Sequence, residues 1–198
     1  MDEQLNERQS FAIIEQMISR AKNNFSESGT LFLIWGFVIL ICSAVHFSAG
    51  YFFDSEKGSY VWSLTWLGSI FQVFYLRRQN RFKKVKTWSD DIIKYLWLIF
   101  FICIALLTFI LIWQKAFFSI LPAILVMYGM PTFFTGILLK FKPLVIGGIS
   151  CWLFALICIF TPWYFQVLYI GAAGITAWII PGVYLRKKYL KEKAIDGR

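Results

Sequence analysis

Six long runs of apolar residues alternate with short polar segments along the 198-residue chain. A helix crosses a bilayer core of roughly 30 Å with about 20 residues, and each run approaches or reaches that length. The runs occupy most of the chain, so we predict an all-α polytopic membrane protein, a single bundle of six transmembrane helices. The predicted spans are residues 30–51, 60–76, 95–113, 116–139, 144–160 and 164–185.

The connections on one side of the predicted membrane are short. Residues 52–59 join spans one and two, residues 114–115 join spans three and four, and residues 161–163 join spans five and six. Short connections make consecutive helices antiparallel neighbours. The pattern therefore predicts three antiparallel hairpins.

Residues 5–25 show a different pattern, with apolar positions three and four residues apart at Phe11, Ile14, Ile18, Ala21 and Phe25. That period predicts an amphipathic helix. Such a helix lies in the membrane surface, packs beneath its own bundle, or engages a partner. Its polar face carries charges of both signs, which favours packing on the bundle or on a neighbouring subunit at least as much as binding to lipid.

These patterns divide the chain into parts. Residues 1–29 form the predicted cytoplasmic amphipathic helix with its cap, and residues 30–185 form the bundle. Residues 77–94 form a basic cytoplasmic loop within the bundle domain, and residues 186–198 form a basic cytoplasmic tail.

Composition and charge support a lipid environment. The chain is 59% hydrophobic and has a mean hydropathy of +0.63, above the range of soluble domains. Of its twenty Lys and Arg residues, 18 fall on the side of the termini and only Lys57 and Lys115 on the other. Basic residues stay in the cytoplasm during insertion, so we expect an inner (plasma) membrane protein with both termini cytoplasmic.

The net charge of +9 is thus explained by topology and by contact with membrane lipids, and we expect no nucleic-acid partner. The candidate contacts to lipid headgroups lie in the 77–94 loop. They are Arg77, Arg78, Arg81, Lys83 and Lys84.

The inventory of reactive side chains is small. All Asp, Glu, Lys and Arg residues lie outside the predicted spans, whereas ion-coupled carriers and pumps usually hold one within the membrane. Motifs of metallo-enzymes, serine hydrolases and ATPases are absent from the sequence. We therefore predict a protein that is not an enzyme, with no catalytic, cofactor-binding or metal-binding residues.

The isolated polar and sulfur-bearing residues are interpreted as packing residues. The only histidine, His46, lacks acidic or thiol partners for a metal site, and we expect it to be hydrogen-bonded. Gln72 is expected to bond across helices. The cysteines all fall inside apolar runs and are expected to be small packing residues. They are Cys42, Cys103, Cys151 and Cys158.

Two proline-containing spans define a candidate notch. Pro131 in span four should kink the helix and free the carbonyl of Met127, and Pro181 in span six frees the carbonyl of Ala177. Facing broken helices form sites in many transporters. The alternative is that these residues only shape helix packing. The candidate notch consists of Tyr128, Pro131, Thr132, Thr135, Trp178 and Pro181.

Small residues four apart allow helices to approach closely. Three such pairs predict that spans four to six form a tightly packed half of the molecule. The pairs are Thr132/Gly136, Gly147/Cys151 and Ala173/Ala177.

Residues 128–136 (YGMPTFFTG), residues 140–148 (KFKPLVIGG) and the early LIWG at 33–36 carry a resemblance. The chain resembles a group of small, uncharacterised bacterial inner-membrane proteins with six spans. The resemblance implies a topology and no activity.

Two functional hypotheses follow. The first is a non-enzymatic regulatory or scaffolding protein, which uses its amphipathic helix and basic loop to bind a cytoplasmic protein or a second copy of itself. The alternative is a passive carrier or channel for a small neutral or lipid-like solute, which passes through the notch between spans four and six.

Overall fold

The computed structural model describes residues 29–53, 56–82 and 88–196, and these ranges are helical with no strand. The predicted amphipathic helix at residues 5–25 and most of the chain between Arg81 and Trp88 lie outside the described residues. Five helices are long and apolar enough to cross a membrane, namely Gly29–Phe52, Ile92–Trp113, Phe117–Leu138, Lys142–Ile159 and Trp163–Lys187. Their ends differ from those of predicted spans one, three, four, five and six by at most three residues.

The elements follow one another with short connections. Helix α7 continues through a π-helical turn, η3, into α8, so the three form one long helix. The bounds are α2 Gly29–Phe52, the 3₁₀ segment η1 Glu56–Trp62, α3 Ser63–Phe82, α4 Trp88–Trp113, the 3₁₀ turn η2 Phe117–Ser119, α5 Ile120–Leu138, α6 Lys142–Ile159, α7 Trp163–Gly174, η3 Ile175–Ile179 and α8 Ile180–Asp196.

Helix α3 is the element that departs from the other five. Its apolar part ends before Arg77, which leaves 14 helical residues, about 21 Å at 1.5 Å per residue. The three residues from Tyr60 to Trp62 belong to η1 and add about 6 Å at the longer 3₁₀ rise. The predicted second span, residues 60–76, is therefore part 3₁₀ and part α, and the apolar part of α3 alone is too short to cross a membrane core of roughly 30 Å.

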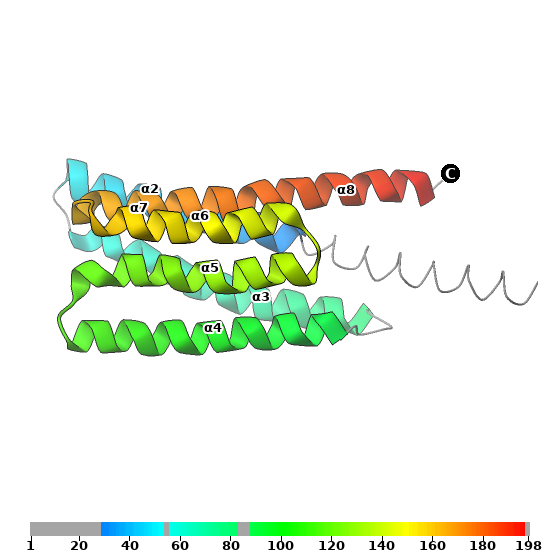
Figure 1. The fold of residues 1–198 in the computed structure, drawn as a ribbon, viewed down its shortest axis with the longest axis horizontal. Helices are drawn as coiled ribbons and strands as arrows, with labels where there is room; N and C mark the ends of the chain where they lie inside the picture. The colour runs from blue at the N-terminus through cyan, green and yellow to red at the C-terminus, as the bar shows by residue number, and fades with distance from the viewer. Residues whose placement is uncertain (1–28, 54–55, 83–87, 197–198) are drawn as a thin grey trace, which may run out of the picture.

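Figure 1 shows the helices side by side with their axes roughly along one direction. The start of α2, the α3–α4 connection, the α5–α6 turn and the end of α8 lie at one end of the bundle. The most extensive contacts join α5 to α6 and α2 to α7, whereas α4 packs mainly on α5 and η2, and α3 on α2 and η1. The two pairs with the largest contacts therefore lie outside the three expected hairpins.

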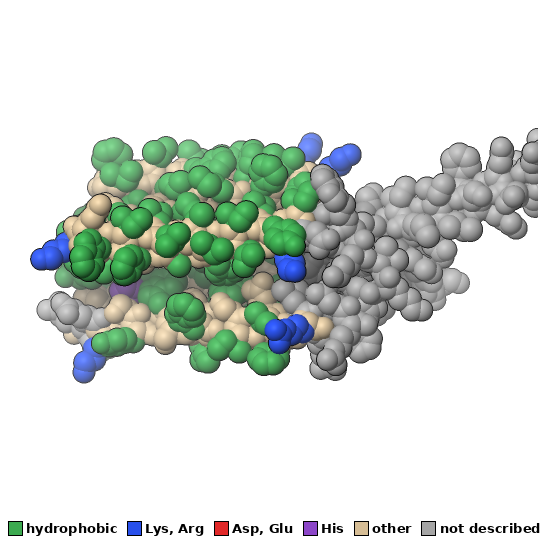
Figure 2. All heavy atoms as spheres, turned by 90° about the horizontal axis from the view of Figure 1, so that it is seen from below, with side chains coloured by type: hydrophobic (Ala, Val, Ile, Leu, Met, Phe, Trp, Pro, Cys, Tyr) green, Lys and Arg blue, Asp and Glu red, His purple; other side chains and the backbone are tan. Residues whose placement is uncertain are grey.

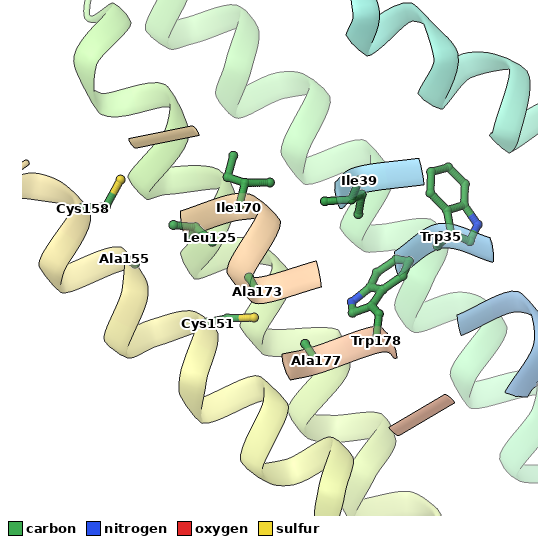
Figure 3. Close-up of a cluster of buried hydrophobic side chains, with 10 residues drawn as sticks. All are labelled: Trp35, Ile39, Leu125, Cys151, Ala155, Cys158, Ile170, Ala173, Ala177 and Trp178. Atoms are coloured by element: carbon green, nitrogen blue, oxygen red, sulfur yellow. The ribbon is translucent and has the colours of Figure 1, made fainter. Parts of the chain in front are cut away.

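Small residues bring the closest helices together. A Cβ placed on Gly148 of α6 would lie 2.6 Å from the Cβ of Phe133 in α5, and one on Gly147 would lie 2.6 Å from the Cα of Ala177 in η3. Cys151, Ala173 and Ala177 share one buried cluster, which Figure 3 shows between α5, α6 and α7. The predicted close approach of spans four to six is thus confirmed at these positions.

A second seam joins α2 to the α7–α8 helix. Its α2 side carries Gly29, Gly36 and Ser43, which are spaced seven residues apart. Gly29 faces Leu185, Gly36 faces Ile179, and the Ser43 hydroxyl donates a 2.6 Å hydrogen bond to the carbonyl of Val167. This seam places the first helix of the described residues against the last.

Candidate functional site

Four of the six residues of the candidate notch are fully buried. Pro131, Thr132, Thr135 and Pro181 have almost no exposed surface. The rings of Tyr128 and Trp178 are in edge contact, with centroids 5.7 Å apart. Tyr128 of α5 and Trp178 of η3 are therefore in contact, while α5 otherwise packs mainly on α6 and α4 and has few contacts with η3 or α8.

The backbone at the two prolines differs between the helices. Helix α5 continues as an α-helix through Pro131, and the Thr132 hydroxyl donates a 2.8 Å bond to the carbonyl of Tyr128. In the last long helix, η3 is a π turn in which the Ile180 N–H bonds to the carbonyl of Ile175. The wider turn lies directly before Pro181, where the missing N–H disrupts the regular ladder.

Thr135 is the polar exception in this region. Its hydroxyl oxygen is buried and has no hydrogen-bond partner among the described residues. An unbonded buried hydroxyl is destabilising by about 1–3 kcal/mol. This atom is the one observation in the notch that suits a polar guest.

Trp178 of η3 is the centre of an aromatic cluster, here called the Trp178 cluster. Its ring lies 5.6 Å from that of Trp97 and 6.0 Å from that of Trp35. Phe32 lies 6.3 Å away, and Phe100 contacts Tyr128 at 5.1 Å. Figure 3 shows the Trp35 and Trp178 rings next to each other. The cluster members are Phe32 and Trp35 from α2, Trp97 and Phe100 from α4, Tyr128 from α5, and Trp178.

Two tryptophan side chains fasten α3 and η1 to α2. The indole N–H of Trp35 donates a 2.6 Å bond to the Gln72 amide oxygen, so the predicted bond of Gln72 across helices is confirmed. The indole N–H of Trp62 donates a 2.9 Å bond to Nδ1 of His46, which confirms His46 as a hydrogen-bonded packing residue.

Gln166 is a buried polar residue that the sequence reasoning missed. Its amide donates 3.1 Å bonds to the carbonyls of Cys158 and Thr161, at the end of α6 and just beyond it. It thereby gives the Cys158 carbonyl a donor in addition to the Thr161 N–H, and it bonds the Thr161 carbonyl just beyond the end of the helix. Gln166 directly follows three aromatic residues, Trp163 to Phe165, and the hydrophobic pattern there did not show which side of the helix is buried. A glutamine inside an apolar run is still a signal, because such a side chain needs a hydrogen-bond partner.

The cysteines lie within helices as expected. Cys42, Cys151 and Cys158 are buried and Cys103 is partly buried, all with free thiols. Within the described part of the chain, no three His, Cys, Asp or Glu residues come close enough to hold a metal ion.

Of the predicted headgroup contacts, Arg77 is exposed near the end of α3. The side chains of Arg78, Arg81, Lys83 and Lys84 lie outside the described residues.

Two open apolar grooves lie on the outer surface. One, of about 310 Å³, lies along α2 beside Ala44, Ser48 and Phe53. The other, of about 540 Å³, lies between α5 and α6 and includes Trp152 and Met130. Neither groove includes a residue of the candidate notch.

Comparison with known proteins found no relative of this chain. The chain matches no protein-family model and shows no significant similarity to any curated protein or solved structure.

Proposed function

We propose that the chain is a six-span inner-membrane protein with both termini in the cytoplasm and three antiparallel hairpins. Five helices have the length and apolarity of spans. The sixth would be α3 together with the end of η1, which in Figure 1 runs between the same two ends of the bundle. Of the 20 basic residues, 18 lie before α2, around the α3–α4 connection, around the α5–α6 turn, and toward the end of α8 and beyond it. The described helix ends next to these segments lie at one end of the bundle in Figure 1, which supports a single cytoplasmic face.

For a protein with this topology, the proposed role is regulatory or scaffolding, without catalysis. The observation that supports it is the filled centre of the bundle, where the Trp178 cluster joins α2, α4, α5 and η3 by ring contacts. A solute path or an active site at mid-membrane needs polar groups that are free to bind, and among the described residues Thr135 carries the one buried side-chain polar atom without a partner. Recognition is then assigned to the cytoplasmic face, with residues 1–29 and the basic 77–94 loop.

The test removes the predicted amphipathic helix and leaves the bundle intact. In-cell crosslinking and co-purification are compared between the full chain and a chain lacking residues 1–25. A matched variant replaces Glu7, Glu15 and Ser19 on the polar face by Ala, and another replaces Phe11, Ile14 and Ile18 on the apolar face by Ser. Loss of a specific partner or oligomer with the deletion and the apolar-face variant supports the role, if both proteins still insert. A full chain that forms no specific crosslink refutes it.

The second candidate function is a passive carrier for a small neutral or lipid-like solute, and the buried, unbonded Thr135 hydroxyl favours it. Transport would require the ring contact between Tyr128 and Trp178 to open. Liposome flux of a small neutral solute should then fall with Pro131→Ala and Thr132→Val. Flux equal to that of protein-free liposomes excludes the carrier and leaves the scaffold.

A further inference from the structure

A hollow separates α3 from α4 on one side of the bundle. In Figure 2 the two helices form two bands with the hollow between them, and the only histidine of the chain is visible at one end of it. Among the described residues, α3 and α4 share almost no close contact, although they follow each other in the chain. The hollow is thus a groove between consecutive helices and not a packed interface.

The attachment of α3 explains why this groove stays open. Helix α3 meets α2 through one face, where Gly68 lies against the Trp35 ring and Gln72 accepts the Trp35 indole N–H. Large apolar side chains on its other faces are exposed, and so are many on α4. They include Trp66, Ile70 and Val73 on α3, and Leu98, Ile102 and Leu106 on α4.

An apolar groove of this kind is filled by lipid chains once it lies in a membrane. Water is excluded from the bilayer core, and an empty gap forfeits dispersion contacts along both helices. Flexible acyl chains are the apolar material available at that depth. A groove bounded by two helices holds a chain more tightly than a flat helix face, because more of the chain surface is in contact.

Positive charge is found at one end of the groove. Arg77 near the end of α3 and Lys94 near the start of α4 are both exposed, at the end of the bundle where α3 connects to α4. Figure 2 shows basic side chains on both sides of the hollow there. Between residues 77 and 94 the sequence has seven basic residues and two acidic ones, Asp90 and Asp91. The net charge favours an anionic group over a zwitterionic one.

We propose that the α3–α4 groove is a binding site for one anionic phospholipid, whose acyl chains lie between the two helices and whose phosphate headgroup lies between Arg77 and Lys94. The bound lipid takes the place of a helix–helix contact and holds α3 next to α4. The site requires the proposed membrane insertion but is independent of the scaffolding role.

The test uses the full chain in lipid nanodiscs with a photoactivatable phosphatidylglycerol, which carries its reactive group in the acyl chain. Crosslinked positions are mapped by mass spectrometry. The expected result is labelling of α3 and α4 well above that of α6, whose exposed Ile146, Leu153 and Leu156 report the ordinary lipid shell. Unlabelled phosphatidylglycerol should compete for the excess labelling, and unlabelled phosphatidylcholine should not.

Two double variants are compared, and each removes two positive charges from one end of the bundle. Arg77→Gln with Lys94→Gln should weaken binding about 25-fold, from about fivefold for each basic residue near the membrane surface. Lys57→Gln with Lys115→Gln removes two basic residues of the other end and should change nothing.

Three results would overturn the site: equal labelling of α6 and the groove, equal labelling by a phosphatidylcholine probe, or undiminished labelling of the Arg77/Lys94 variant. Labelling of α6 shows in each case that the bundle is inserted, so these failures are distinct from a failure of the membrane proposal.

Discussion

Gly148 is the position where one added methyl group tests the α5–α6 interface most directly. The new Cβ of Gly148→Ala would lie 2.6 Å from the Cβ of Phe133 and 2.8 Å from its Cα and N. Backbone atoms cannot rotate away, so the two helices must separate. A separation of about 0.5 Å forfeits roughly a quarter of the dispersion energy of the contacts involved.

The magnitude follows from two opposing effects. Overpacking of this kind destabilises a protein by about 1–3 kcal/mol, and the higher helix propensity of alanine returns about 1 kcal/mol. We expect Gly148→Ala to lower the free energy of unfolding by up to about 2 kcal/mol. The control is Gly50→Ala, whose Cβ would lie 3.4 Å from the Tyr164 ring, an ordinary contact. It should be neutral or slightly stabilising.

The assay is unfolding by sodium dodecyl sulfate in mixed micelles, monitored by far-ultraviolet circular dichroism. It compares the parent chain with Gly148→Ala and Gly50→Ala. Gly148→Val should be worse than Gly148→Ala because two further methyl groups meet the same backbone. If both Gly148 variants unfold at the same detergent fraction as Gly50→Ala, then α5 and α6 are not in contact at this position.

Three further predictions use the same measurement. Trp178→Ala removes four ring contacts and should lower the free energy of unfolding by about 3 kcal/mol, whereas Trp113→Ala, which is 80% exposed, should leave it unchanged. Lys140→Gly should raise it by about 1 kcal/mol, because Lys140 ends α5 with a φ of 50° that costs an L-residue strain; a lower stability would show that the lysine side chain matters more than this strain. Gln166→Leu should lower it by about 1–2 kcal/mol, since two hydrogen bonds of about 1 kcal/mol each are lost, and faster hydrogen exchange at the end of α6 would locate the effect.

Much of the secondary structure was predictable from local pattern. An apolar run of about 20 residues forms a helix in lipid because every backbone group must be bonded within the segment, and five runs did so with ends within three residues of the prediction. Isolated polar side chains in such runs must also find partners, which is why bonds were expected, and found, at His46 and Gln72. The weaker second run became a 3₁₀ segment followed by α3, and the apolar part of α3 is brief because arginines follow it from Arg77 onward.

Local pattern was enough to show which segments are helical and which small residues allow close approach. Which helix faces meet became known from the three-dimensional fold alone. In a helix that is apolar on all sides, no amphipathic stripe marks the buried face, so the pairing of α2 with α7 and α8 was not readable from any one segment. The Trp178 cluster draws its rings from four separate elements, and the groove beside α3 exists because its neighbour in sequence packs elsewhere. Helix formation depends on neighbouring residues, whereas these contacts depend on residues far apart in the chain.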